Sequence, residues 1–267
     1  MIHEGASFSL ERSAVFGSTL LTRMLLEYLD DVAPPQFVLG LSPEALTTKA
    51  NGVDLRGFCH ERRIPHQDEA DWPHVAARLR ELEVNTVLVF GDSRIVPEEI
   101  TSGFAVVGNH GALLPDVRGG ASLVWGRMAD LGYWGVSVFR LTAELDGGEI
   151  LGTRRFDYDS ERPMREFVEL ADRATIEVFR LILEGEAAPA ANLSCVTRIQ
   201  KGVDSHEGVV RMRAAMANGE PVYMPIRTPA DAFVNPEWPP EFRRAFMIAN
   251  DSPYPRWTTE PIPGASA

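Results

Sequence analysis

The first two thirds of the chain alternate between short, uniformly apolar runs and stretches in which apolar residues recur at helical spacing. The apolar runs lie at residues 14–16, 37–41, 86–90 and 104–107, and three of them end at a glycine. Between the first two runs, leucines and a methionine recur every three or four residues over 20–29. Strands buried on both faces read as continuous apolar runs, and their alternation with helices is typical of a parallel sheet. The sequence therefore predicts an α/β fold with a mostly parallel, twisted sheet.

The pattern changes after residue 130. Residues 136–141 alternate apolar and polar positions, which predicts a strand, and a further strand is expected from Glu149 to Phe156. A long amphipathic helix follows over 167–182 and closes at Gly185.

A stretch of small residues at 186–192 resembles a linker. We therefore expect one large domain over residues 1–187 and a small C-terminal subdomain or tail over 188–267. The C-terminal part is rich in proline and aromatic residues and has one expected helix, at 205–218. Its proline content favours an extended tail packed on the main domain.

Charge and composition narrow the function. The chain has 26 basic and 38 acidic residues, a net charge of −12, so a nucleic-acid partner is not expected. No apolar run approaches the roughly 20 residues that span a bilayer, and the N-terminus lacks a secretion-signal pattern. We expect a cytoplasmic protein without a membrane partner. Cys59 and Cys195 are expected to be reduced, and no histidine spacing predicts a metal site.

The segment most suggestive of chemistry begins where the fourth apolar run ends. The run continues into Asn109 and His110, then into Leu-Leu-Pro and the pair Arg118-Gly119. Ligands of open α/β sheets bind at the carboxyl ends of strands. A histidine there titrates near working pH, and a neighbouring amide can donate to an oxygen that gains charge. The alternative is a turn-forming Asn-His-Gly with no catalytic role.

Several ordered motifs together resemble the formyltransferase family, including its methionyl-tRNA and sugar N-formyltransferase members. Residues 110–119 are similar to the family's His-x-x-Leu-Leu-Pro…Arg-Gly signature, 135–138 to its Gly-Val-Thr strand, and 145–151 to its Leu-Asp-x-Gly-x-Ile-Leu block. Residues 15–18 and 89–97 resemble its opening strand and its Gly-x-x-Ile/Leu-Pro segment. The resemblance covers about residues 13–185.

The resemblance implies a Rossmann-like domain that uses 10-formyltetrahydrofolate. By the same resemblance, Arg118 would face the amine acceptor. The residues implied to line the cofactor pocket are Phe90, Gly91, Ile95, Leu141 and Glu144.

His110, Asp146 and Asn109 are the implied catalytic residues. His110 would stabilise the developing oxyanion and help to move the amine proton, while Asp146 would orient the imidazole and raise its pKa, or hold a relaying water. The family asparagine stands two residues before the histidine, where this chain has Gly108. Three explanations stay open: an irregular backbone at Gly108 that lets Asn109 swing in, another oxyanion donor, or a lost activity. We favour the first, because glycine tolerates unusual dihedral angles.

The predicted function is formyl transfer from 10-formyltetrahydrofolate to a primary amine of a small molecule, such as an amino sugar carried on a nucleotide or a biosynthetic intermediate. Two alternatives remain: a formyltetrahydrofolate hydrolase that uses water as acceptor, and a non-catalytic folate-binding protein on the same scaffold. The sequence leaves the oligomeric state, including a homodimer, open.

Overall fold

The computed structural model describes residues 8–68, 71–194 and 197–260. The chain divides into two compact units that are interleaved along the sequence. The first unit consists of Met1–Asn109, Val138–Gly152 and Thr175–Ala190, and the second of His110–Ser137, Thr153–Ala174 and Ala191–Ala267. The boundary that the sequence suggests at residue 187 stays a prediction.

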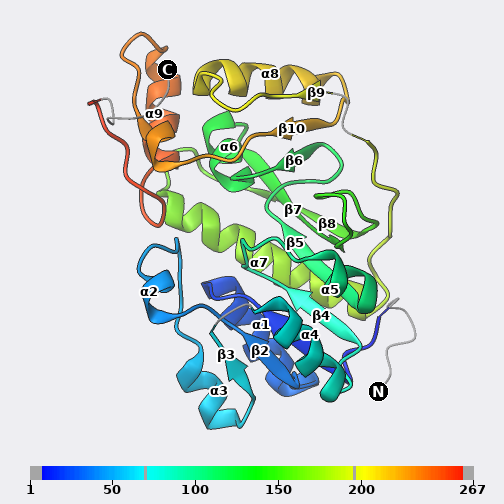
Figure 1. The fold of residues 1–267 in the computed structure, drawn as a ribbon. Coiled ribbons are helices and arrows are strands. Elements are labelled where there is room, and N and C mark those ends of the chain that lie inside the picture. Colours follow the sequence, from blue (N-terminus) through cyan, green and yellow to red (C-terminus); the bar gives the residue numbers. More distant parts are fainter. Residues whose placement is uncertain (1–7, 69–70, 195–196, 261–267) are drawn as a thin grey trace. The chain divides into compact units, whose positions relative to one another are not determined.

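A seven-stranded sheet has the order β3-β2-β1-β4-β5-β7-β8 (Figure 1). Its strands are β1 (Ser13–Phe16), β2 (Phe37–Leu39), β3 (His66–Gln67), β4 (Thr86–Val89), β5 (Ala105–His110), β7 (Tyr133–Arg140) and β8 (Ile150–Asp157). The pairs β1–β2, β1–β4, β2–β3 and β4–β5 are parallel. The predicted α/β fold with a mostly parallel sheet is thus confirmed.

Five helices connect the strands of the first unit, and a sixth runs through both units. The five are α1 (Leu20–Val32), α2 (Pro43–Leu46), α3 (Arg56–Arg62), α4 (Trp72–Glu81) and α5 (Glu98–Gly103). The sixth, α7 (Met164–Leu183), has its first half in the second unit and its second half in the first.

Strands β1, β2, β4 and β5 each contribute residues to both faces of the sheet. Val15, Val38 and Leu88 share one buried cluster with residues of α1, α3 and the second half of α7. Phe16 and Val87 belong to another cluster, with residues of α4 and α5. The sheet is therefore covered on both faces, which explains why most residues of its central strands are apolar.

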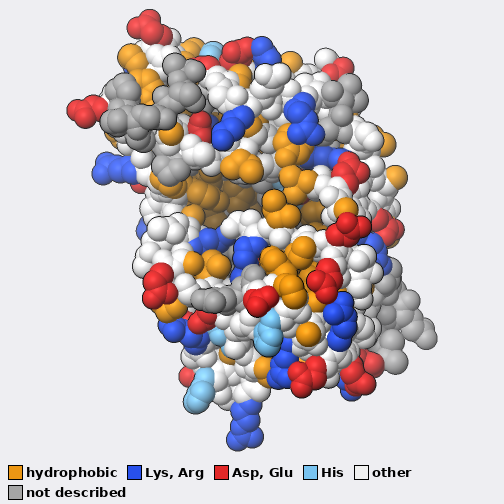
Figure 2. Space-filling view, in the orientation of Figure 1, with side chains coloured by type: hydrophobic (Ala, Val, Ile, Leu, Met, Phe, Trp, Pro, Cys, Tyr) orange, Lys and Arg blue, Asp and Glu red, His pale blue; other side chains and the backbone are white. Residues whose placement is uncertain are grey.

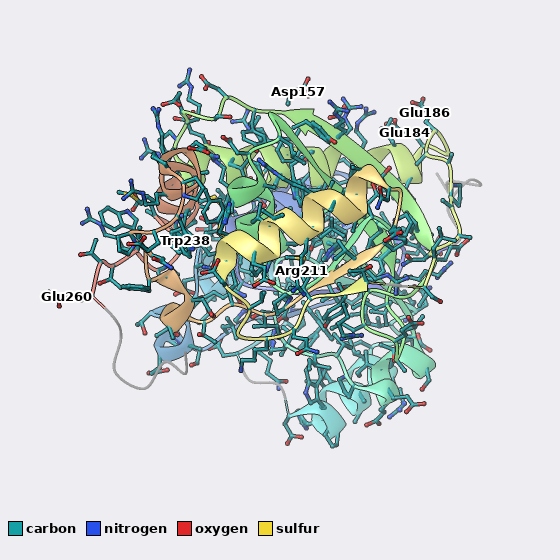
Figure 3. All side chains as sticks on the ribbon, turned by 90° about the horizontal axis from the view of Figure 1, so that it is seen from above. Asp157, Glu184, Glu186, Arg211, Trp238 and Glu260 are labelled. Atoms are coloured by element: carbon teal, nitrogen blue, oxygen red, sulfur yellow. The ribbon has the colours of Figure 1, made fainter. Side chains whose placement is uncertain are left out.

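The second unit has its own three-stranded parallel sheet, in the order β6 (Val117–Gly119), β10 (Val222–Met224), β9 (Thr197–Arg198). Its core joins apolar residues of β6 and β10 to those of α6 (Ser122–Ala129), α8 (Ser205–Ala217) and α9 (Pro240–Ala249). The Trp238 indole, beside α9 in Figure 3, donates to the carboxylate of Asp204 at 2.9 Å. Because Asp204 caps the N-terminus of α8, this bond ties the segment before α9 to α8.

The prediction of an extended C-terminal tail is wrong for residues 240–249, which form α9. Pro239 and Pro240 stand at the start of this helix, where a missing backbone N–H costs nothing. Phe242, Phe246 and Ala249 then recur at helical spacing and are buried. The prolines therefore begin a helix rather than prevent one.

Two further findings bear on the expected class of protein. Within the described residues, every helix is too short or too polar to cross a bilayer. Cys59 is a free, buried thiol, while Cys195 lies outside the described residues. The cytoplasmic location stays a prediction.

Candidate active site

His110 is the last residue of β5 and is buried, with 7% of its surface exposed. Its Nε2 atom lies 3.0 Å from the carbonyl oxygen of Val117. A carbonyl can only accept a hydrogen bond, so Nε2 carries a hydrogen and the neutral ring has its lone pair on Nδ1. Nδ1 is therefore the nitrogen of His110 that can take up a proton.

The Val117 carbonyl is held in place by the small sheet of the second unit. The Val222 amide of β10 donates to the backbone carbonyl of Asp116 at 2.9 Å, and the Gly120 amide donates to the backbone carbonyl of Met224 at 3.2 Å. Successive carbonyls of a strand point in opposite directions, so the Val117 carbonyl faces away from β10 and is available to His110. Strand β10 thus positions the acceptor that fixes the ring of His110.

Asn109 precedes His110 on β5 and is half-buried. Its side-chain oxygen accepts a hydrogen bond from the backbone amide of Gly91 at 3.2 Å. This bond orients the amide group and leaves the Nδ2 hydrogens as its donors. Asn109 therefore belongs, with Gly91, to the first unit.

Packing explains why position 108 is a glycine, which the sequence alone did not reveal. β5 keeps its parallel register with β4 here, with Gly108 opposite Val89, and the φ of Gly108 is not in the left-handed region. The irregular backbone that we favoured is therefore wrong. A Cβ atom at Gly108 would overlap Leu141 Cδ1 and approach the Val89 carbonyl to 3.2 Å. Leu141 thus fills the space that a side chain at position 108 would need.

The loop between β7 and β8 carries Leu141, Glu144 and Asp146. The Leu141 amide donates to Val106 of β5 at 2.9 Å, which fixes the start of the loop against that strand. Asp146 has a φ of 52°, in the left-handed region that non-glycine residues rarely adopt. Such conformations are concentrated at functional sites, where the surrounding structure holds them.

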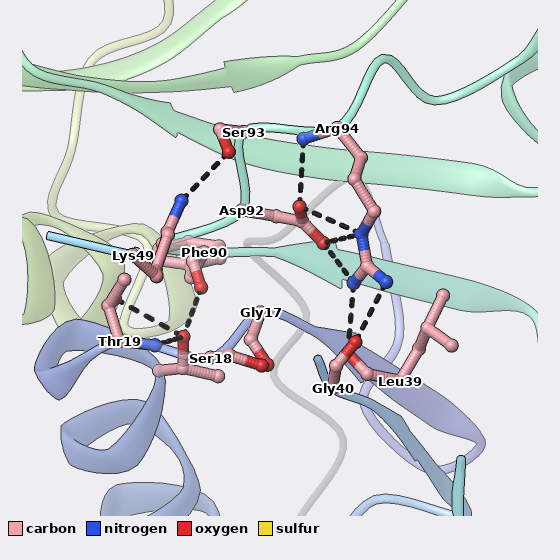
Figure 4. Close-up of polar contacts among 12 residues, drawn as sticks. Gly17, Ser18, Thr19, Leu39, Gly40, Lys49, Phe90, Asp92, Ser93 and Arg94 are labelled. Carbon is pink, nitrogen blue, oxygen red and sulfur yellow. Dashed lines mark hydrogen bonds and ion pairs between the residues drawn. The ribbon is translucent and has the colours of Figure 1, made fainter. Parts of the chain in front are cut away.

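The loop after β4 carries Phe90, Gly91 and Ile95. The Phe90 ring is fully buried, 5.2 Å from the ring of Phe179, and its carbonyl accepts a bond of 2.6 Å from Thr22 Oγ1 (Figure 4). Ile95, by contrast, is 82% exposed. The predicted cofactor contacts of this loop therefore differ: Ile95 can offer its side chain to a cofactor, whereas Phe90 is fully buried and its backbone groups bond to Thr22 and Phe16.

Arg118 is buried in the second unit. Its Nη2 donates to the side-chain oxygen of Asn192 at 2.9 Å and to the carbonyl of Leu193. The guanidinium thus ties β6 to the segment that follows residue 190. Its predicted contact with an acceptor stays a prediction.

The structure brings three predicted residues together through β5: Gly91 bonds to Asn109, and Leu141 packs on Gly108 beside it. The loop after β4 also carries Phe90 and Ile95, and the loop after β7 also carries Glu144 and Asp146. The second unit contains His110 and Arg118. Sequence reasoning missed the Val117 carbonyl, because a backbone acceptor has no residue-type signal. In the part of the chain that the structure describes, His, Cys, Asp and Glu side chains form no group of three that could hold a metal.

The fold defines the class of protein: a Rossmann-like α/β domain with a histidine at the end of a central strand. No family model matches the chain. A methionyl-tRNA formyltransferase of Anaeromyxobacter sp. (strain K) is 26% identical over 140 residues, which are 50% of this chain and 45% of that protein. The homologue of Anaeromyxobacter dehalogenans (strain 2CP-C) is 27% identical over 142 residues, 51% and 46% of the two chains. The chain thus spans about half the length of the curated relatives it matches.

Three solved structures illustrate which proteins share this fold. HypX from Aquifex aeolicus in complex with tetrahydrofolic acid has a TM-score of 0.59 at 16% identity, covering 91% of this chain and 35% of that one. Glycinamide ribonucleotide transformylase 1 from Geobacillus kaustophilus has a TM-score of 0.56 at 16% identity, covering 67% and 99%. The sugar 3N-formyltransferase WlaRD, with dTDP and 5-N-formyl-THF, has a TM-score of 0.59 at 11% identity, covering 90% and 79%. The fold is that of formyltransferases, and the resemblance to this family is confirmed.

Proposed function

We propose that the protein is an enzyme that transfers a formyl group from 10-formyltetrahydrofolate to a primary amine of a small molecule. The observation that carries this proposal is the set of ordered formyltransferase motifs, at 110–119, 135–138 and 145–151, in a chain with the formyltransferase fold. Either alone would be weaker, because one fold hosts many functions.

The residues present fit a folate. Two exposed apolar side chains, Ile95 and Leu145, stand on the loops that follow β4 and β7. Exposed apolar groups beside oriented polar groups are typical of small-molecule sites, and Asn109 supplies an oriented amide next to the β4 loop. We expect this surface of the first unit to hold the pterin ring, with Gly91, Leu141 and Glu144 around it.

In the proposed reaction, the acceptor nitrogen bonds to the formyl carbon that 10-formyltetrahydrofolate would supply. The bond from that carbon to N10 breaks, and tetrahydrofolate leaves with a proton at N10 in exchange for the proton that the amine gives up. His110 takes up the proton that the acceptor amine loses, at Nδ1, while Val117 keeps its Nε2–H in place. Asn109 donates from Nδ2 to the oxygen that gains negative charge. Asp146 is proposed to stabilise the charged imidazole, and Arg118 to stand on the acceptor side.

A small acceptor is favoured over a nucleic acid. The net charge is −12, and on the face shown in Figure 2 the Lys and Arg side chains are dispersed among Asp and Glu side chains. Phosphate-backbone contacts need clustered basic residues. An amino sugar carried on a nucleotide, or another small amine, is therefore the proposed acceptor. The proposed location is the cytoplasm.

The test measures the conversion of 10-formyltetrahydrofolate to tetrahydrofolate with and without a panel of amino sugars, nucleotide amino sugars and amino acids. Conversion that requires an amine supports the transferase. Equal conversion without amine would instead identify a hydrolase, and folate binding without conversion would identify a binding protein.

Variants test the mechanism within the same assay. We expect His110→Ala to lose about two to four orders of magnitude in turnover, the usual contribution of a general base. His60→Ala is the matched control, because His60 is an exposed residue of α3. A His110→Ala enzyme as active as this control would refute the assignment.

A further inference from the structure

The strand order of the first unit contains a topological switch point. From β1 the chain continues outward through β2 to β3, and then returns to the other side of β1 to form β4. Ligands of open parallel sheets bind outside the carboxyl ends of the strands at such a point. Here these ends are Gly17 to Thr19 after β1, and Phe90 to Arg94 after β4.

The N-terminus of α1, where a phosphate binds in many such folds, is covered by the chain itself. The Leu20 amide donates to Asn51 at 3.1 Å, and the Val53 amide donates to Ser18 at 2.8 Å. Thr19 and Thr22 form a capping box with their side chains and amides. The Asn51 carbonyl therefore takes up the Leu20 amide, and the Thr22 side chain takes up the Thr19 amide, two donors that an anion would otherwise use.

The same segment carries Lys49 to the switch point. Its ammonium group donates to Ser93 Oγ at 2.8 Å, across the loop that follows β4 (Figure 4). Lys49 is half-buried, and this burial lowers the pKa of its ammonium group. A cation held partly out of water is disfavoured unless an anion offsets its charge.

The nearby carboxylate, Asp92, is already matched by Arg94. The Nε of Arg94 lies 3.0 Å from each oxygen of Asp92, and its Nη2 lies 2.5 Å from Oδ2. The same guanidinium donates to the carbonyls of Gly40 at 2.8 Å and Leu39 at 3.3 Å (Figure 4). With one carboxylate and two cations, the cluster has an excess of one positive charge in a chain of net charge −12.

The groups that this cluster presents are hydrogen-bond donors. Lys49 has three N–H groups, of which Ser93 takes one, and Ser93 is left with its own O–H to donate. A set of donors with excess positive charge matches a phosphate, whose oxygens only accept. We propose that Lys49 and Ser93 form an anion site that binds a phosphate group. That this phosphate belongs to the amine acceptor rests on the proposed function, whereas the anion site does not.

The chain has only two lysines, Lys49 and the exposed Lys201, which makes a direct test practical. The full chain would be produced with ¹³C-labelled lysine, so that each Cε gives one NMR signal, and pyrophosphate would be added as the probe. We expect the Lys49 signal to shift and its pKa to rise, because the bound anion stabilises the charged form. The Lys201 signal should stay unchanged.

Calorimetry with pyrophosphate then compares variants. Lys49→Gln should weaken binding about tenfold to a hundredfold, the usual worth of hydrogen bonds to a charged group. Lys49→Arg should retain most of the affinity, and Lys201→Gln is the matched control that should retain all of it.

The experiment uses neither folate nor turnover, so its result is independent of the proposed transferase activity. Pyrophosphate that leaves the Lys49 signal in place, or that binds Lys49→Gln as well as Lys201→Gln, would overturn the proposal. A Lys49 signal that responds to tetrahydrofolate and not to pyrophosphate would also overturn it, and would assign the site to the carboxylate tail of the folate.

Discussion

Replacing Asp172 by asparagine should make the stability of the protein less dependent on pH. Asp172 lies in the first half of α7 with 6% of its surface exposed, and its Oδ2 is buried without a hydrogen-bond partner among the described residues. Burial, together with the charge of Glu169, raises the pKa of the Asp172 carboxyl from 3.8 to about 7. The Asp172 charge also adds to the effect of burial in raising the pKa of Tyr254.

The sign of this pH dependence of stability follows from how many protons the folded and unfolded states bind. Between the two pKa values the unfolded chain has lost the proton of Asp172 while the folded protein keeps it, so stability falls as pH rises. The shift of roughly three units corresponds to about 4 kcal/mol in total, lost by the time the pH exceeds the folded pKa. From pH 5 to pH 8 the loss amounts to about 2.5 kcal/mol.

Urea unfolding of the wild type and of Asp172→Asn at several pH values between about 5 and 8 measures this loss. The asparagine cannot ionise, so its own packing cost is the same at every pH, and its stability relative to the wild type should rise by about 2.5 kcal/mol over the range. Asp157→Asn is the matched control, since the Asp157 side chain is 83% exposed (Figure 3). A stability difference between Asp172→Asn and wild type that is constant with pH would refute the reasoning.

Three further predictions follow from the packing. Gly108→Asn should lower the free energy of unfolding by about 1–3 kcal/mol, because the new side chain would overlap Leu141. Leu141→Ala in the same chain should recover part of this loss. Equal unfolding midpoints for Gly108→Asn with and without Leu141→Ala would contradict the steric account. Gly91→Ala should destabilise the protein by about 1–3 kcal/mol, because Gly91 has a φ of 72° and a Cβ atom would overlap Thr19 Oγ1. Thermal unfolding measures this loss, and an unchanged midpoint would argue against it. Arg227→Met should lower the free energy of unfolding in urea by about 2–3 kcal/mol, because the half-buried guanidinium bonds to Ser205 and to the Asp231 carbonyl. A loss below about 1 kcal/mol would mean that these bonds contribute little.

The sequence predicts the large sheet well because its information is local. The runs at 14–16 and 87–90 are apolar at every position, since both faces of β1 and β4 are buried, and each run is long enough to be recognised alone. The long helix α7 is equally visible from its apolar stripe.

The small sheet could not be predicted, because its pairing is not local. β9 has two residues and β6 and β10 have three each, too few for a period to appear. The register that places Val117 beside Val222 depends on the fold of everything between them. For the same reason the motif at 110–119 predicted His110 but not the carbonyl that bonds to it.

The interpretation of Gly108 as a site of irregular backbone was wrong for a related reason. A glycine in a sequence indicates either backbone freedom or close packing, and only the position of Leu141, which lies 33 residues further on, decides between them. Nothing in the sequence singles out Lys49 or Ser93, and only the fold brings them together.

The pairing of β6 with β10 has a consequence for how the protein is made. Met224 lies 105 residues beyond Gly119, its partner in the register. At about 5–20 residues per second, a ribosome needs roughly 5–20 s to synthesise that stretch. Because the exit tunnel delays every residue equally, the same interval separates the emergence of Gly119 from that of Met224. For that time His110 is outside the ribosome without the strand that holds the Val117 carbonyl. The ring of His110 is therefore fixed late in synthesis, well after the strands β1 to β5 have emerged.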